Sequence, residues 1–453
     1  MLTVTGLLAI IALPSILQAL RGSLTIFEPI TILSLVFLLY FAVSPLLYLV
    51  NDQTSYLGRD FRPVYLLGFV GVAISASFMW LGYSLPAGRR VGHWIASRLC
   101  PSALAGLEIT QLAYMRKWGL ALLVGGVAGL ILSLLFGGGS LSSVLLPGVV
   151  TDESSAQPSD GTLNYLFLMM EWFIPAYLLL LAAGALRRRW LAIALAAPIL
   201  AIYVSVGFRF RIVIFLVGVA TVIFAGRSRR HVGALLVGGL ILLAFMGYVG
   251  SARQFYRSGG MIGSPVPGRS DVVENSRSDT RIFETYAAVL SAVPKKVSYS
   301  GLDPLKSVFT LPIPRGFWED KPTGEYLGKI SDSIGTPASR FAGPAIPNFG
   351  EYYLALGWLG VAIGMILFGA AARALWEFWR ASGRNPFALV IYACSLPFLL
   401  LAVIRGYSAQ IVQEWFFIVF PAVVVAQRGR RRLRNQTELR SQQPIASQRA
   451  LRT

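Results

Sequence analysis

The 453-residue chain contains few of the residues from which soluble catalytic and metal sites are built. Only 13% of its residues are charged, against about 25% in ordinary globular chains. This composition excludes a soluble globule and a disordered chain. The two cysteines lie far apart, so they form no disulfide framework. The two histidines stand in no HExxH pattern and the cysteines in no CxxC pattern, which argues against a standard zinc site.

Apolar residues dominate instead, at 55% of the chain, and the mean hydropathy is +0.64. A membrane-spanning helix needs about 20 mostly apolar residues. Eleven such segments are present, so the sequence predicts an all-α polytopic membrane protein. The predicted spans are residues 3–20, 29–50, 64–84, 118–136, 163–186, 190–206, 211–226, 232–251, 352–372, 387–404 and 411–426.

Lys and Arg recur in alternate short loops, and such loops face the cytoplasm under the positive-inside rule. These basic segments are 85–117, 187–189, 227–230, 373–384 and 427–453. Loop 137–162 has acidic residues and no Lys or Arg, so we expect it outside, with the N-terminus outside and the C-terminus in the cytoplasm. The first span could alternatively be a signal peptide, although it lacks a basic start and an A-x-A site. The net charge of +19 therefore indicates membrane orientation and contact with anionic lipid, not nucleic acid.

The predicted organisation has four parts. Residues 1–251 hold eight transmembrane helices, including the cytoplasmic segment 85–117, where we expect an interfacial helix. Residues 252–350 form a large outer loop, and residues 351–426 hold the last three helices. Residues 427–453 form a basic cytoplasmic tail.

Ionisable residues in or beside the spans gather near the predicted outer face. They are Glu171, Arg209, Arg211, Arg253, Arg257, Glu351, Arg405 and Glu414. A charge at bilayer depth costs about 2.5–3.5 kcal/mol on insertion scales, so these residues indicate a functional site. Arg binds phosphate through a planar fork and keeps its charge, which favours an anionic lipid headgroup. Each Arg could instead be a boundary anchor, and Glu171 could be the ion-pair partner of one of them.

Four short patterns occur in order between residues 200 and 426. They are Gly207-Phe-Arg209-Phe-Arg211, the stretch Pro314-Arg315-Gly-Phe-Trp318-Glu-Asp-Lys321-Pro322, the stretch Gly350-Glu351-Tyr352 through Gly357 to Gly360, and Arg405-Gly406. Together they resemble the "GxR", "PRxxWxxKP", "GExYxxFGxxG" and "RG" motifs of the O-antigen polymerase (Wzy-type) family of oligosaccharide repeat-unit polymerases. Each motif is weak alone, and the resemblance rests on their order along the chain.

The resemblance implies a glycosyltransferase-C-like membrane fold and transfer of a growing glycan from undecaprenyl diphosphate to a lipid-linked repeat unit. It implies a metal-independent enzyme without a cofactor, in the bacterial inner membrane, with its active face in the periplasm. The expected partners are the lipid-linked oligosaccharide, membrane lipid, and the chain-length regulator and flippase of the same pathway. The product could be O-antigen, capsule or exopolysaccharide.

The resemblance also suggests roles for individual residues. The acceptor hydroxyl needs a general base, and both histidines fall on the predicted cytoplasmic side, so Glu351 is the first choice, ahead of Glu319, Asp320 and Glu414. Glu351 could alternatively be a favourable charge at a helix N-terminus. The predicted catalytic residues are Glu351, Arg315 and Arg211. The predicted diphosphate- and glycan-binding residues are Arg209, Arg211, Arg253, Arg281, Arg315, Lys321, Arg405, Trp318 and Tyr352.

Two other functions fit a chain of this kind. An O-antigen ligase shares the expected fold, but ligases carry a functional histidine in the outer loop, where this chain has none. A flippase for lipid-linked glycans usually has internal repeats and polar residues near the bilayer midplane, and neither is evident in the sequence. The sequence therefore favours the polymerase.

Overall fold

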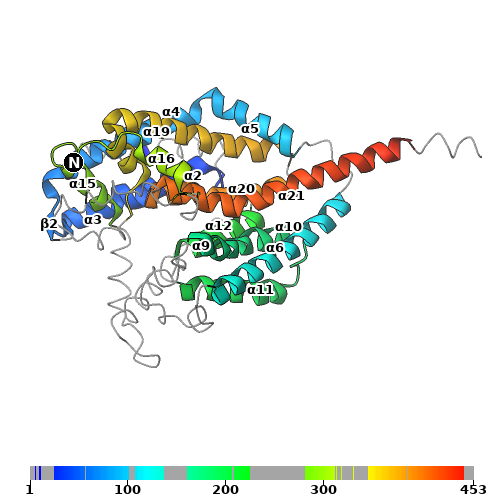
Figure 1. Cartoon of the computed structure of the whole chain (residues 1–453). Helices are drawn as coiled ribbons and strands as arrows, with labels where there is room; N and C mark the ends of the chain where they lie inside the picture. Colours follow the sequence, from blue (N-terminus) through cyan, green and yellow to red (C-terminus); the bar gives the residue numbers. More distant parts are fainter. Residues whose placement is uncertain are drawn as a thin grey trace, which may run out of the picture.

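A computed structural model of the chain describes residues 6, 10–11, 25–56, 58–100, 108–136, 161–206, 209–224, 281–311, 313, 318, 330, 345–383 and 385–442. Within these ranges the protein is all-α apart from one two-stranded hairpin, β1 (Ser55–Tyr56) with β2 (Arg59–Asp60). Figure 1 shows the helices in two groups, with α20 (Pro386–Arg405) and α21 (Ser408–Gln442) running between them.

Seven helical runs are long and apolar enough to cross a membrane, which confirms seven of the eleven predicted spans. They are Pro29–Val50, Arg62–Ser84, Gln111–Phe136, Tyr165–Ala182, Asn348–Ala381, Pro386–Arg405 and Ser408–Arg432. Two further predicted spans correspond to shorter apolar helices, Arg189–Val204 and Phe210–Phe224. The predicted span 232–251 lies outside the described residues, as does most of 3–20. Apart from the hairpin, the described chain is thus helical, with the seven candidate membrane spans of a polytopic protein.

The first core joins a continuous helical run to the helices of the upper group in Figure 1. The run consists of α2 (Pro29–Leu38), the π-helical turn η1 (Leu39–Val43) and α3 (Ser44–Val50). It packs with α4 (Tyr65–Ser84), which follows the short turn η2 (Arg62–Val64), and with α15 (Ile282–Ala292) and α19 (Asn348–Ala381). Helices α4 and α19 run parallel in close contact, because Gly82 lies against the Ile366 carbonyl and Gly369 against that of Met79.

The second core lies in the lower group of Figure 1. It contains α6 (Glu108–Phe136), α9 (Gly161–Leu168), the 3-10 turn η4 (Met169–Trp172), α10 (Phe173–Ala182), α11 (Arg189–Val206) and α12 (Arg209–Phe224). Helices α20 and α21 pack against this group as well, and α20 also contributes Leu400 and Val403 to the first core. The two cores therefore meet along α20.

Helix α19 is interrupted, which the predicted continuous span 352–372 did not anticipate. Leu356 and Gly357 leave helical geometry, and Gly357 has φ 63° and ψ −147°, a conformation suited to glycine. Residues 348–355 therefore form a separate two-turn helix, which we call the lead-in helix. The amides of Ser300 and Gly301 donate to its last carbonyls, at 2.9 and 3.0 Å.

The chain folds back after the lead-in helix. Gly360 lies against the carbonyl of Tyr352, and Gly364 lies against the Tyr352 ring. Phe349 packs edge-on against Phe41 and Tyr286, with ring centroids 5.0 and 4.8 Å apart. The lead-in helix, which carries Glu351, is therefore fixed by packing against the rest of α19, η1 and α15.

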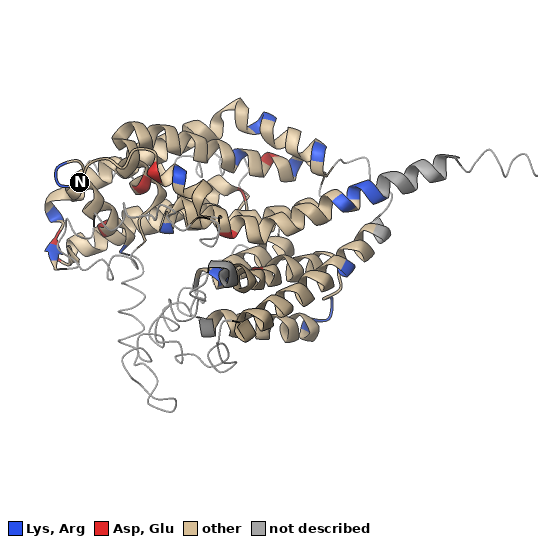
Figure 2. Ribbon diagram, viewed as in Figure 1, with Lys and Arg blue, Asp and Glu red and all other residues tan. Residues whose placement is uncertain are grey.

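Basic residues gather at one end of the helix bundle. At this end, called the Glu377 end, Glu377 pairs with Arg373 and lies 3.7 Å from Arg380 Nη1 and 3.6 Å from His93 Nε2. Helix α5 (Pro86–Leu99) packs on the last turns of α19 here, and Arg430 donates to the carbonyl of Arg98. Figure 2 shows Lys and Arg gathered on α5 and the far part of α21. Several predicted cytoplasmic basic segments thus lie together, and the interfacial location of α5 stays a prediction.

Candidate functional site

A buried ion pair lies at the end of the bundle opposite Glu377, which we call the Glu351 end. Arg211, in the first turn of α12, is 2% exposed, and its Nε pairs with Oε1 of Glu171, which is 0% exposed in η4. Behind the pair, the buried Tyr203 hydroxyl donates to the Met170 carbonyl at 3.3 Å. The structure thus confirms the interpretation of Glu171 as the ion-pair partner of one of the two arginines of this turn.

The guanidinium groups of Arg405 and Arg211 both lie near the ring of Phe210. The Arg405 guanidinium carbon lies 4.5 Å from the centroid of the Phe210 ring, and that of Arg211 lies 5.4 Å from it. A guanidinium at this distance from a ring is attracted by the negative potential of the ring face. Two of the four sequence patterns, more than 190 residues apart, therefore meet at Phe210. Phe210 was not among the predicted site residues, although it stands between the two arginines of the turn.

Glu351 reaches from the lead-in helix to the start of α21. Its Oε2 accepts hydrogen bonds from the Ser408 amide at 3.0 Å and the Ser408 hydroxyl at 2.6 Å. Its Oε1 lies 3.3 Å from the same amide. The side chain is 1% exposed. A carboxylate is favourable at a helix N-terminus, where backbone amides lack partners. The helix that Glu351 caps is α21, not its own helix as the sequence suggested.

The turn between α20 and α21 also contacts the lead-in helix. Gly406 (φ 56°, ψ −143°) and Tyr407 (φ 53°) both have positive φ. A Cβ atom at Gly406 would overlap the carbonyl oxygen of Ile346. The residue types at Gly406 and Ser408 are therefore explained by this junction, which we call the 346–408 clasp: residues 346–351 and 405–408.

Glu414 lies further along α21 than Ser408, at the same end of the bundle. It is 5% exposed, and its Oε1 accepts a hydrogen bond from Gln410 Nε2 at 3.0 Å. Arg211, Glu171 and Arg405 all lie within electrostatic range of its carboxylate. The described part of the site thus contains three carboxylates and two guanidinium groups, contributed by η4, α12, α19, α20 and α21.

The remaining predicted residues are only partly accounted for. Arg253, Arg315 and Lys321 lie outside the described residues, as do Glu319 and Asp320, and Arg209 begins α12 with a side chain that is not described. Trp318 is 40% exposed, and Tyr352 packs on Gly364. Within the described ranges, no group of three or more His, Cys, Asp or Glu residues could hold a metal ion.

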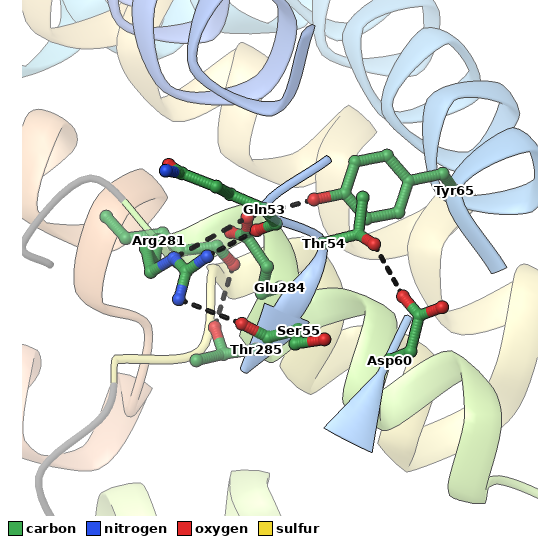
Figure 3. Close-up of polar contacts among 9 residues, drawn as sticks. Gln53, Thr54, Ser55, Asp60, Tyr65, Arg281, Glu284 and Thr285 are labelled. Carbon is green, nitrogen blue, oxygen red and sulfur yellow. Dashed lines mark hydrogen bonds and ion pairs between the residues drawn. The ribbon is translucent and has the colours of Figure 1, made fainter. Parts of the chain in front are cut away.

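Arg281 lies at the same end of the bundle but binds the backbone of the hairpin segment. Figure 3 shows its guanidinium donating to the carbonyls of Gln53 (2.5 Å) and Ser55 (3.0 Å). The guanidinium carbon also lies 4.5 Å from the Tyr48 ring centroid. These contacts tie the start of α15 to the α3–α4 connection, so the structure gives Arg281 a role in holding α15 in place.

Glu284 lies beside Arg281 with its side chain fully buried. Its Oε1 accepts a hydrogen bond from the Tyr65 hydroxyl at 3.0 Å and lies 4.0 Å from Arg281 Nε (Figure 3). Burial raises the pKa of the Glu284 carboxyl above its ordinary value, and the Tyr65 hydrogen bond and Arg281 offset only part of this rise. Keeping Glu284 ionised therefore opposes folding.

Glu284→Gln should change how stability depends on pH. The pKa of Glu284 is higher in the folded than in the unfolded chain, so the native state binds more protons at pH values between the two. The contribution of Glu284 to the free energy of unfolding therefore falls as pH rises through this interval. We expect Glu284→Gln to raise the melting temperature relative to wild type more at about pH 8 than at about pH 4.5. Thermal unfolding in detergent measures this, and an equal difference at both pH values would contradict it.

No protein-family model matches the chain, and comparisons with curated proteins and with solved structures find no significant match. The resemblance to O-antigen polymerases therefore rests on the sequence patterns alone and stays a prediction.

Proposed function

We propose that the protein is a polysaccharide polymerase of the bacterial inner membrane. It would transfer a growing glycan from undecaprenyl diphosphate to a lipid-linked repeat unit at the periplasmic face, with the Glu351 end of the bundle facing the periplasm. The reaction needs no nucleotide, because the energy lies in the glycosyl–diphosphate bond of the substrate.

The observation that carries the proposal is the meeting of three sequence patterns at one end of the bundle. The Gly207–Arg211 pattern, the Gly350-Glu351 segment and the Arg405-Gly406 pattern come from three distant parts of the chain. Arg405 and Arg211 share the Phe210 ring, and Glu351 bonds to Ser408. Chance matches to short patterns would have no reason to converge.

The chemistry of the transfer suits this arrangement. As the glycosyl bond breaks, negative charge grows on the leaving diphosphate, and guanidinium groups already in place stabilise that charge. Arg211, in the first turn of α12, pairs with Glu171, and Arg405 ends α20 with its guanidinium on the Phe210 ring, within electrostatic range of Glu414. We expect Arg405 to contact the diphosphate directly, with Arg211 adding positive charge beside it.

The test uses purified protein in detergent with a synthetic lipid-diphosphate repeat unit and EDTA. We expect wild type to form a ladder of longer lipid-linked glycans and Arg405→Ala to lower the rate about 10²–10³-fold, as for loss of one preorganised donor. Arg405→Lys should recover part of the rate, because it keeps the charge but loses the planar fork. Arg62→Ala is the matched control, since Arg62 is an exposed arginine that pairs with Asp52 near the start of α4.

Three outcomes would contradict the proposal. A ladder that requires a divalent cation would exclude the metal-independent mechanism. Transfer of the glycan to lipid A in place of a second repeat unit would identify a ligase. Movement of the lipid across liposomes without any ladder would identify a flippase, the second function that a buried ion pair in membrane-spanning helices could serve.

A further inference from the structure

We infer that Glu351 is a positioning residue that closes the 346–408 clasp and so holds Arg405 in place, and that Glu414 is the group that takes the proton from the acceptor hydroxyl. The role of Glu414 rests on the proposed function. The role of Glu351 rests on geometry alone and can be tested without any substrate.

Both oxygens of the Glu351 carboxylate already face Ser408. Oε2 accepts from both the amide and the hydroxyl of Ser408, and Oε1 faces the same amide. The residue is 1% exposed. A general base must reach the proton it removes, directly or through one water. To do so, Glu351 would have to release the first turn of α21.

The clasp fixes the backbone directly after Arg405. The backbone turns at Gly406 and Tyr407, both with positive φ, and Gly406 lies directly against the Ile346 carbonyl. A non-glycine residue at positive φ is strained and persists only where its surroundings enforce it. The Ser408 hydrogen bonds to Glu351 supply that constraint at the residue after Tyr407. Arg405 immediately precedes the turn, so the direction of its side chain towards Phe210 depends on the clasp.

The carboxylate of Glu414 accepts fewer hydrogen bonds than that of Glu351. Its Oε1 accepts one hydrogen bond from Gln410. Within the described ranges, its Oε2 accepts no hydrogen bond from another side chain or amide. Its carboxylate lies within electrostatic range of Arg405, Arg211 and Glu171. In the transfer, the acceptor hydroxyl oxygen forms a bond to the anomeric carbon as the carbon–oxygen bond to the diphosphate breaks. The bonding electrons leave with the diphosphate, and the hydroxyl proton passes to Glu414.

Hydrogen exchange tests the clasp independently of activity. We expect Glu351→Ala to speed amide exchange in peptides covering 405–412 about tenfold, the effect of losing one helix cap. Glu351→Gln, which keeps an acceptor oxygen, should stay within about threefold of wild type. Ser408→Ala should fall between them, and Glu414→Gln should leave this region unchanged. Unchanged exchange in Glu351→Ala would overturn the clasp.

Polymerisation kinetics test the division of roles between the two carboxylates. We expect Glu414→Gln to lower kcat about 10²–10⁴-fold with little change in KM, and to abolish the fall in rate on the acid side of the pH profile. Glu351→Gln should keep the fall in rate on the acid side. It should lower kcat only about fivefold, because it displaces Arg405 slightly and removes no reacting group. If Glu351→Gln loses the acid limb while Glu414→Gln keeps it, Glu351 is the base and the inference is wrong.

The two experiments separate failure of this inference from failure of the proposed function. If wild type forms no ladder with an authentic lipid-linked substrate, the proposed polymerase and the role of Glu414 both fall. Faster exchange in Glu351→Ala would then still support Glu351 as the closing residue of the clasp.

Discussion

Replacing Gly406 by alanine should inactivate the protein and destabilise it more than any other single methyl addition at the Glu351 end. Two effects combine at this position. The backbone has φ 56° and ψ −143°, which only glycine adopts without strain, and the new methyl group would overlap the Ile346 carbonyl oxygen. Strain of this kind costs about 1–3 kcal/mol, and the overlap adds to it, so we expect a total of about 3–4 kcal/mol.

Thermal unfolding in detergent and the polymerisation assay measure the two consequences. Gly301→Ala is the matched control, because Gly301 also has positive φ (60°) but nothing lies within 4 Å of the added methyl group. It isolates the backbone strain, about 1–2 kcal/mol. If both variants lose the same stability, the contact between Gly406 and Ile346 contributes nothing, and the clasp is not the tight junction that the structure indicates.

Hydropathy predicted the described spans well because each spanning helix satisfies its own backbone hydrogen bonds, so its existence depends mainly on local composition. The ends of the helices were less predictable. The break in α19 at Leu356–Gly357 depends on distant partners, since Ser300 and Gly301 supply the amides that end the lead-in helix. A local pattern of apolar residues contains no information about such partners.

For the candidate site, too, the sequence predicted the residues but not their contacts. Residue type alone identified Arg211, Glu171, Arg405, Glu351 and Glu414, because charged groups are costly in a membrane segment wherever they occur. Which carboxylate pairs with which donor depends on how α12, α19 and α21 meet. Sequence reasoning therefore named Glu351 as the first choice of base but could not detect that Ser408 occupies its oxygens.

Removing either partner of the buried pair between Arg211 and Glu171 should destabilise the protein strongly. Both side chains are at most 2% exposed, so the remaining charge would stay buried without the charge it is paired with. Loss of one partner of a buried pair costs about 3–5 kcal/mol. We therefore expect Arg211→Met and Glu171→Met each to lower the melting temperature and the yield of folded protein, by more than Arg62→Ala, which breaks an exposed pair.

The double variant Arg211→Met with Glu171→Met separates stability from function. Replacing both members of a buried ion pair by apolar residues of similar size is often neutral or stabilising, so we expect this variant to melt near the wild-type temperature. If the pair only supports the fold, activity should return with stability. If Arg211 stabilises the charge of the leaving diphosphate, as proposed, the stable double variant should remain at least about 10²-fold slower than wild type. A double variant that is stable and fully active would remove Arg211 from the mechanism and leave Arg405 as the principal diphosphate-binding group.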